Sequence, residues 1–236
     1  WTNQLPTVSR GYILARDAVS TLGRRPTEDE YEALRQWIND TAAVDRESGT
    51  SPTLPGLRPL LTTPRDILGR AFVPSHETYA QAVNATYAAM MHEFVGLHEK
   101  AFDCGLDLLI FPQGTRSIQL TRGRIGLAQV ALRYKKTVVP VGCSGSHLLY
   151  PGESPWAKPG RVVYRIGEPI PYGSVPDTHI STPFEPFTPE AEHAHREVFQ
   201  RHVDHVMDRI NELVDPEFQY GPDPDGGVLA GTERFL

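Results

Sequence analysis

The middle of this chain contains a short apolar run, a segment with helical spacing and a second short apolar run. Leu106–Phe111 is ended by Pro112 and is typical of a strand buried inside a sheet. Residues 126–134 have helical spacing, and Thr137–Gly142 is again apolar and short. A strand, a helix and a strand at this spacing form a βαβ unit. The sheet is therefore expected to contain a parallel pair.

The turn after the first strand, residues 112–117, carries groups that suit an anionic ligand. Gly114 lets the backbone approach a ligand closely. Thr115 and Ser117 offer hydroxyls, and Arg116 offers a fork of donors that matches a phosphate. The alternative is a surface turn whose arginines pair with nearby acids.

A second basic run, Arg122-Gly123-Arg124, lies just before the helix predicted over 126–134. Together with the turn it brings three arginines, two glycines and a helix N-terminus close together in the sequence. Backbone N–H groups at a helix start and flexible glycine backbone both favour anions. The two segments together predict an anion site.

Further helices and strands are predicted around this unit. Thr27 and Glu30 fit a capping box at a helix start, and Pro74-Ser75-His76-Glu77 looks like another helix entry. Residues 45–66, 171–189 and 216–236 are predicted to be loops or extended segments. The predicted helices are Thr27 to Val44, Pro74 to Phe102, 126–134 and Pro189 to Val214, and the predicted strands are Ile67 to Val73, 106–111, 137–142 and Arg161 to Ile166.

The order of these elements predicts an α/β fold: a mixed, partly parallel sheet flanked by helices, with an N-terminal helical element. A length of 236 residues suits a single domain over 1–236. Within it, 1–66 would be the N-terminal helical and loop element, 67–170 the core that carries the motifs, and 171–236 the C-terminal loop, helix and tail.

Charge and cysteine content narrow the class of protein. A net charge of -6 argues against a general nucleic-acid binder. Cys104 and Cys143 lie outside metal-binding spacings, which predicts reduced core thiols in a cytosolic protein. His202 and His205 could share a helix face, but no carboxylate or cysteine motif converges on them, so no metal is expected.

Contact with a membrane is expected to be peripheral. No stretch approaches the roughly 18 consecutive apolar residues of a membrane span, and no signal peptide opens the sequence. Any deeper membrane contact would need residues outside this chain. Tyr12 to Ala15, Trp37 and the loop 45–66 are the segments that could touch lipid, each being equally well a core or surface segment.

The string Phe-Pro-Gln-Gly-Thr-Arg-Ser resembles the Phe-Pro-Glu-Gly-Thr-Arg-Ser block of the 1-acylglycerol-3-phosphate acyltransferase family, which acts on glycerolipids and lysophospholipids. The resemblance covers roughly residues 67–170. Its further matches are the basic and glycine positions Arg122, Gly123 and Gly126, the apolar-proline strand Val138–Val141 and, loosely, an acceptor-side block at Gly69–Val73.

This resemblance implies transfer of a fatty acyl group from acyl-CoA or acyl carrier protein to the hydroxyl of a lysophospholipid such as 1-acylglycerol-3-phosphate. The setting would be phospholipid biosynthesis at the cytoplasmic face of a bacterial membrane. The acyl donor is a co-substrate, and no bound cofactor is implied. The residues implied to hold the acceptor phosphate are Gln113, Gly114, Thr115, Arg116, Arg122 and Arg124, with Arg70 on the acceptor side.

Gln113 stands where the family usually has Glu. Glutamine keeps a hydrogen-bond acceptor and adds a donor, but it loses the charge. Against an anionic acceptor that loss is tolerable, so the substitution does not by itself argue for inactivity.

The family's catalytic block is a His, four residues, and an Asp, in which the His takes the proton from the attacking hydroxyl and the Asp orients the imidazole. This spacing occurs once, at His98 and Asp103. It lies downstream of the family position, on the long helix before the first strand. Residues five apart on a helix point about 140° apart. We therefore expect a coincidence, with His98 solvated or helix-terminal.

Three explanations for the missing histidine stay open. The sequence given omits the catalytic segment, for example around residues 45–66. Alternatively, the chain is a catalytically inactive relative that acts as a lipid-phosphate binding or regulatory module. Last, another base has taken the role, with His76 the best candidate because it lies near the acceptor-side block, although a surface helix-entry residue is the plainer interpretation of His76.

Overall fold

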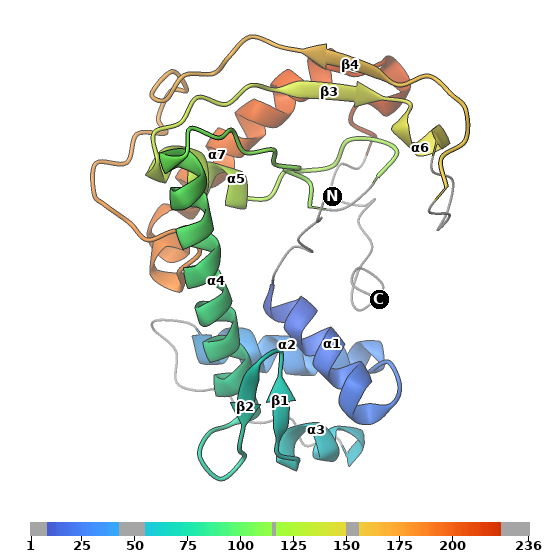
Figure 1. The fold of residues 1–236 in the computed structure, drawn as a ribbon, viewed down its shortest axis with the longest axis vertical. Helices are drawn as coiled ribbons and strands as arrows, with labels where there is room; N and C mark the ends of the chain where they lie inside the picture. Colours follow the sequence, from blue (N-terminus) through green and yellow to red (C-terminus); the bar gives the residue numbers. More distant parts are fainter. Residues whose placement is uncertain (1–8, 43–54, 115–116, 150–155, 223–236) are drawn as a thin grey trace. The chain divides into compact units, whose positions relative to one another are not determined.

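A computed structural model of the chain describes residues 9–42, 55–114, 117–149 and 156–222 (Figure 1). The chain falls into two compact units, one formed by the described residues up to Leu109 and the other by those from Ile110 onward. The single domain expected over 1–236 stays a prediction.

Three helices form the frame of the first unit: α1 (Arg10–Leu22), α2 (Glu28–Ala42) and α4 (Tyr79–Asp103). They pack pairwise on one another (Figure 1). The short helices η1 (Pro55–Leu57) and α3 (Arg58–Thr62) complete the unit, with α3 against α1. The expected N-terminal helical element is therefore present.

Capping residues explain where the first two helices begin and end. Ser9 accepts a hydrogen bond from the Tyr12 N–H at the start of α1, and Gly23 closes it in the left-handed conformation with φ 66°. Sequence reasoning missed this helix. The box predicted for α2 is confirmed: Thr27 N–H donates to Glu30 over 2.9 Å, and the Glu30 N–H donates to the Thr27 hydroxyl over 3.2 Å.

A hairpin replaces the single strand predicted over 67–73. Strands β1 (Arg65–Ile67) and β2 (Arg70–Phe72) pair antiparallel, with Arg65 opposite Phe72. The turn residues Leu68 and Gly69 both have positive φ, 50° and 91°, as a tight two-residue hairpin turn requires. The long helix then begins at Tyr79, later than its predicted entry, because Thr78 and Gln81 form a capping box there.

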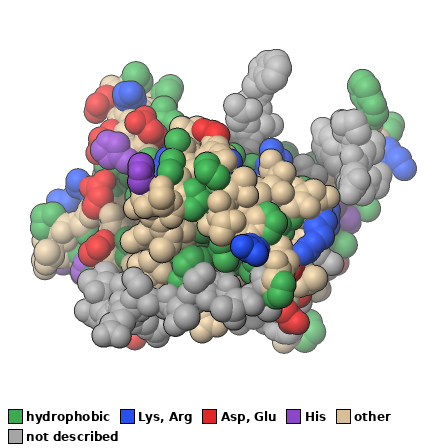
Figure 2. Space-filling view, turned by 90° about the horizontal axis from the view of Figure 1, so that it is seen from below, with side chains coloured by type: hydrophobic (Ala, Val, Ile, Leu, Met, Phe, Trp, Pro, Cys, Tyr) green, Lys and Arg blue, Asp and Glu red, His purple; other side chains and the backbone are tan. Residues whose placement is uncertain are grey.

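The core of the first unit contains apolar side chains from all of its helices and from the hairpin. Ile13, Leu14 and Ala15 are fully buried, and Trp37 is almost so. These residues were candidates for lipid contact, and their burial assigns them to the core instead. On the face shown in Figure 2, hydrophobic side chains lie in small groups separated by polar atoms.

The second unit is a two-stranded sheet packed on a long helix. Strands β3 (Val141–Ser144) and β4 (Val163–Ile166) pair antiparallel, with Val141 opposite Ile166 (Figure 1). Helix α7 (Pro189–Leu213) contacts β3 and α5 (Gly126–Arg133). The short helices α6 (Ser146–Leu149) and η2 (Pro216–Phe218) complete the unit.

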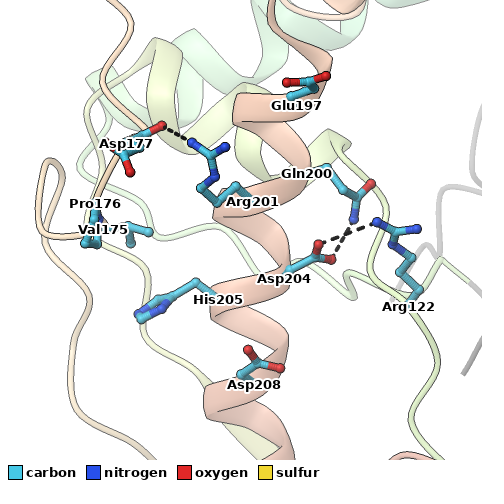
Figure 3. A pocket seen from close by; sticks show the side chains of 10 residues that line it. All are labelled: Arg122, Val175, Pro176, Asp177, Glu197, Gln200, Arg201, Asp204, His205 and Asp208. Carbon is cyan, nitrogen blue, oxygen red and sulfur yellow. Dashed lines mark hydrogen bonds and ion pairs between the residues drawn. The ribbon is translucent and has the colours of Figure 1, made fainter.

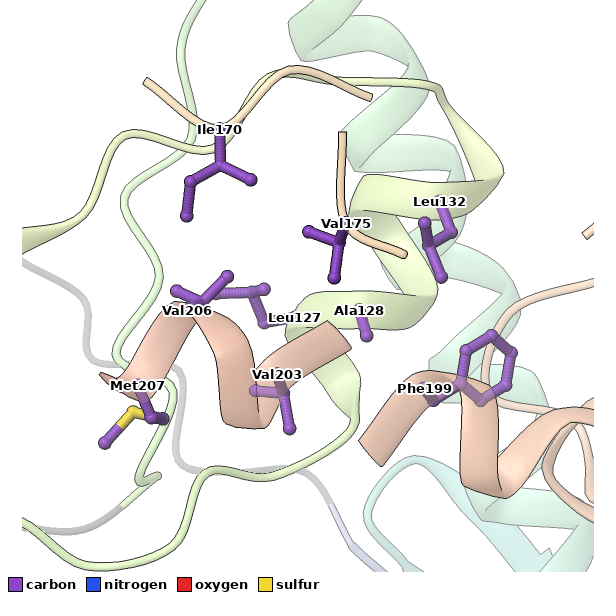
Figure 4. Close-up of a cluster of buried hydrophobic side chains, with 9 residues drawn as sticks. All are labelled: Leu127, Ala128, Leu132, Ile170, Val175, Phe199, Val203, Val206 and Met207. Carbon is purple, nitrogen blue, oxygen red and sulfur yellow. The ribbon is translucent and has the colours of Figure 1, made fainter. Parts of the chain in front are cut away.

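A single apolar cluster holds α5, α7 and the irregular segment after β4 together (Figure 4). Helix α7 contributes Phe199, Val203, Val206 and Met207 to this cluster, at the spacing of one helix face. Ile110, Val138 and Ile210 pack at its edge. The buried members are Leu127, Ala128, Leu132, Ile170, Val175, Phe199, Val203, Val206 and Met207.

The expected βαβ unit is not present among the described residues. Leu106–Phe111 has no strand partner and forms no strand, and β3 pairs with β4 rather than with this segment. Both described sheets are two-stranded and antiparallel, so the expectation of a parallel pair is wrong for this part of the chain. An apolar run becomes a strand only where a neighbour completes its ladder, and the sequence pattern does not show whether one exists.

Other predicted boundaries hold. Gly105, with φ 70°, follows the end of α4, and the Leu106 N–H donates to the Ala101 carbonyl over 2.9 Å, as in a glycine-ended helix. Helix α7 covers the predicted range from Pro189, capped by Thr188. Among the described residues, no helix is both long and apolar enough to cross a membrane.

Candidate phosphate-binding turn

Gly114 turns the backbone directly after Gln113. Its φ is 69°, and its N–H donates to the Phe111 carbonyl over 3.0 Å. A residue with a side chain rarely adopts this conformation, so glycine is required here for the turn itself. Thr115 and Arg116, the next two predicted phosphate ligands, lie outside the described residues.

The Gln113 side chain organises two hydroxyls. Its Nε2 donates to Ser117 Oγ over 2.8 Å and to Thr121 Oγ1 over 3.0 Å. Because each hydroxyl accepts from the amide, each keeps its own hydrogen to donate elsewhere. A glutamate at this position would itself accept from hydroxyls. Glutamine thus turns Ser117 and Thr121 into donors suited to an anion.

Backbone hydrogen bonds close the loop that carries these groups. The Arg124 N–H donates to the Pro112 carbonyl over 2.8 Å, and the Leu120 N–H donates to the Phe218 carbonyl over 3.0 Å. The first bond joins the two ends of the loop and the second ties its middle to η2. The predicted turn and the predicted basic run are therefore neighbours in space, as the sequence analysis expected.

Arg124 is exposed, and no ion pair involves it in the described part of the chain. It stands two residues before α5, which begins at Gly126 with Ile125 as its N-cap and no side-chain cap. No side chain at the N-cap therefore accepts from the first N–H groups of α5. A free guanidinium beside an uncapped helix start is the strongest described part of the anion site.

Arg122 points elsewhere. Its Nη2 lies 3.6 Å from Asp204 Oδ2 on α7, and it borders a hollow of about 610 Å³ (Figure 3). The residues around this hollow include four carboxylates, those of Asp177, Glu197, Asp204 and Asp208. Such surroundings disfavour a phosphate, so Arg122 fits an ion pair with a local acid better than the predicted phosphate contact.

Gly123 has a packing role. A Cβ placed there would lie 2.9 Å from Val203 Cγ2 and 2.8 Å from Met207 Cγ. The glycine therefore lets the loop lie directly on α7. Its match to a family glycine position is explained by this close approach without any contact to a ligand.

His98 is buried in α4, not solvated as expected. Its Nδ1 donates to the Phe94 carbonyl over 2.7 Å, and its ring packs edge-on against the Phe94 ring at 4.2 Å between centroids. Asp103 is exposed at the last position of α4 and makes no hydrogen bond to His98. The expectation that this pair is a coincidence of spacing agrees with their separation on the helix.

His76 and Arg70 lie in the first unit. His76 is exposed and borders a hollow of about 410 Å³ with Trp37 and Gln81. Arg70 forms a two-point ion pair with Glu77, at 2.7 and 2.8 Å, and this carboxylate raises the pKa of Arg70. The guanidinium fork that was expected on the acceptor side is thus occupied by Glu77.

Thr121 is the site residue that sequence reasoning missed. It is buried, and its hydroxyl is held by Gln113, eight positions earlier. No sequence signal marks it, since a threonine in a loop is ordinary. Only the closure of the loop on itself brings the two residues together.

Comparison of the chain with protein-family models, with curated proteins and with solved structures finds no match in any of the three.

Proposed function

We propose that the chain is an O-acyltransferase that moves a fatty acyl group from acyl-CoA or acyl carrier protein to a lysophospholipid-type acceptor such as 1-acylglycerol-3-phosphate. The observation that carries the proposal is the arrangement around Gln113, which leaves two hydroxyl hydrogens to donate in the loop that ends at the exposed Arg124. These are neutral and charged donors of the kind that a phosphate monoester accepts. The sequence motif supplies the reaction.

In the proposed reaction the acceptor phosphate is held at the turn while the acceptor's free hydroxyl attacks the thioester carbonyl. A C–O bond forms, the C–S bond breaks, and the proton of the hydroxyl leaves through a base to the departing thiolate. The turn therefore binds and orients the acceptor. His76, the base that the sequence offered, lies in the first unit, so no residue of the turn's own unit is assigned as the base.

The test is an acyl-transfer assay with acyl-CoA and two acceptors, 1-acylglycerol-3-phosphate and the phosphate-free monoacylglycerol. Arg124→Ala should raise the KM for the phosphate-bearing acceptor about tenfold or more, because a charged hydrogen bond is worth about 1.5–3 kcal/mol. The KM for monoacylglycerol should not change. Arg35→Ala is the matched control, since Arg35 is an exposed helix arginine whose ion pair in the described part of the chain is with Glu32 over 2.6 Å.

A second function is a lipid-phosphate binding or regulatory module without chemistry. One observation favours it: the imidazole of His98 is committed to the Phe94 carbonyl and is not oriented by Asp103. Isothermal titration separates the two functions. Binding of 1-acylglycerol-3-phosphate that Arg124→Ala weakens, together with no acyl transfer by the wild type, would establish the module and exclude the enzyme.

A further inference from the structure

The β3–β4 sheet has one face whose side chains are mainly apolar and largely exposed. Val141 is opposite Ile166 and Cys143 is opposite Tyr164 in the antiparallel register, so these four side chains share a face. Val139 continues the alternation. Ile166 is 75% exposed, Tyr164 67%, Val139 49% and Val141 39%. Exposed apolar side chains gathered on one sheet face differ from single ones, which need no explanation.

The opposite face of the same sheet packs on the end of α7. A Cβ on Gly142 would lie 2.7 Å from Leu213 Cβ, so this face lies directly on the end of α7. Ser144 Oγ accepts from the Asp215 N–H over 2.9 Å, and Arg165 donates to the Leu213 carbonyl over 3.0 Å. The sheet therefore has a packed inner face and an apolar outer face, although an outer face in water usually alternates to polar.

Exposed basic residues flank the two strands of the apolar face in the sequence. Lys135 is exposed a few residues before Val139, and Lys158 and Arg161 are exposed in the connection that leads into β4. The segment 135–168 as a whole carries five lysines and arginines against two glutamates, whereas the whole chain has a net charge of -6. Arg165 is one of the five and pairs with Asp215 on the inner face, so Lys135, Lys158 and Arg161 are the basic residues that flank the apolar face along the chain.

We propose that this face, defined by Val139, Val141, Cys143, Tyr164 and Ile166, docks on an anionic lipid surface. Apolar side chains that enter the interface, together with lysines and arginines that meet anionic headgroups, are the two sources of peripheral membrane binding. A partner protein would have to match the rim with acids, whereas an anionic membrane presents negative charge everywhere. Tyr164 suits this boundary because it joins an apolar ring to a polar hydroxyl.

This face is where the proposed acyltransferase would contact the membrane. The proposal rests on the proposed function in one respect: a lipid acceptor makes a membrane the expected partner. It also moves the expected lipid contact. The segments around Tyr12 and Trp37 were candidates from sequence, and their apolar side chains belong to the core of the first unit.

The experiment is vesicle flotation of the full chain with phosphatidylcholine alone and with phosphatidylcholine mixed with phosphatidylglycerol. Binding is expected to the mixed vesicles, and it should weaken as salt is raised. The double variant Tyr164→Ser with Ile166→Ser should lower the partition coefficient at least about tenfold. Leu97→Ser is its control, because Leu97 is an exposed leucine on α4 in the other unit.

Two charge-reversal variants separate the electrostatic contribution to vesicle binding from the apolar one. Lys158→Glu should reduce binding to the mixed vesicles severalfold, because each basic residue near an anionic surface contributes about 1 kcal/mol. Lys100→Glu makes the same change of charge on an exposed lysine of α4 and should leave binding unchanged. Circular dichroism and thermal melting of each variant show that it is folded.

The inference would be overturned if the wild type did not float with the mixed vesicles, or if the double variant at Tyr164 and Ile166 floated like the wild type. It would also be overturned if light scattering showed that the wild type is a dimer and that the double variant is a monomer. The proposed function fails separately. Vesicle binding without acyl transfer removes the enzyme alone, and acyl transfer to a soluble short-chain acceptor without vesicle binding removes the docking surface alone.

Discussion

Arg65 and Asp17, 48 positions apart, form a two-point ion pair in the first unit: Arg65 Nε lies 2.8 Å from Asp17 Oδ1 and Nη2 lies 2.5 Å from Oδ2. The pair joins α1 to the first strand of the hairpin. Asp17 is buried, and the Arg65 guanidinium also lies 5.2 Å from the centre of the buried Tyr79 ring. Burial, with Asp17 nearby, raises the pKa of Tyr79 well above its ordinary value.

Removing one partner of this pair should cost more than removing both. Arg65→Ala leaves the Asp17 carboxylate buried without a counter-charge, which should lower the free energy of unfolding by about 3–5 kcal/mol. The double variant with Asp17→Ala should recover part of that loss. Urea unfolding of the two single variants and the double variant measures the coupling, and additive losses would contradict it.

The sequence predicted helices better than strands. Thr27, Glu30 and Thr188 mark helix starts through contacts three residues away, and such local contacts are readable from spacing. The strand expected over 106–111 depended on a neighbour that the described chain does not provide. The ion pair of Asp17 with Arg65 was likewise not predictable, because 48 residues separate its members.

The candidate site divides in the same way. Gly114 was predicted to let the backbone approach a ligand, which stays a prediction, and its positive φ adds a second reason for glycine that the sequence did not show. Arg122 and Arg124 look equivalent in the sequence, but one faces Asp204 and the other has no ion pair among the described residues. Which arginine remains available depends on α7, 80 or so residues later in the chain, and no local pattern carries that information.

The burial of His202 should make the stability of the fold depend on pH. It is buried with neither ring nitrogen hydrogen-bonded in the described structure, and this burial, with His205 nearby, lowers its pKa to about 4. The unfolded chain, with the ordinary value of 6.5, therefore binds more protons between these pH values. Stability should rise with pH across this window and fall as the pH drops from 6.5 toward 4.

His202→Leu should remove this contribution to the slope. The free energy of unfolding of the variant should exceed that of the wild type by more at pH 5 than at pH 8, because leucine has nothing to protonate and leaves no polar atom unpaired. Denaturant unfolding at both pH values measures the difference. An unchanged slope in the variant would show that His202 is protonated equally in both states.

The ion pair of Glu30 with Arg24 should give the stability a second pH dependence, at more acidic pH. The hydrogen bonds from Arg24, with help from the Thr27 N–H, lower the pKa of Glu30 to about 2. A lowered carboxyl pKa stabilises the fold above the unfolded value of 4.5, and this contribution is lost as the pH falls toward 2. Glu30→Gln should flatten the acid limb of the stability curve. Glu32→Gln is the control, because Glu32 is a half-buried carboxylate on the same helix that also pairs with an arginine, Arg35.

Replacing Gln113 should weaken binding of the acceptor while the stability of the fold changes little. Gln113→Ala frees Ser117 and Thr121 to hydrogen-bond each other or water, so the two donors lose their common direction. Affinity for 1-acylglycerol-3-phosphate should fall by about 1 kcal/mol for each misplaced hydrogen bond. Titration calorimetry measures this, with monoacylglycerol as the phosphate-free comparison. Equal losses for both ligands would place Gln113 away from the phosphate.

A side chain at Gly142 should destabilise the fold, because the sheet lies directly on α7 at this position. An alanine Cβ there would lie 2.8 Å from the Leu213 carbonyl carbon and 3.0 Å from its oxygen, and a backbone cannot rotate away as a side chain can. Gly142→Ala should therefore destabilise by about 1–3 kcal/mol, the usual cost of overpacking. Gly96→Ala is the matched control. A Cβ at Gly96 meets nothing within 4 Å inside α4, so this variant should gain up to about 1 kcal/mol from helix propensity. Thermal unfolding of both variants decides the point, and a Gly142→Ala melting temperature at or above that of the wild type would contradict the close contact between β3 and α7.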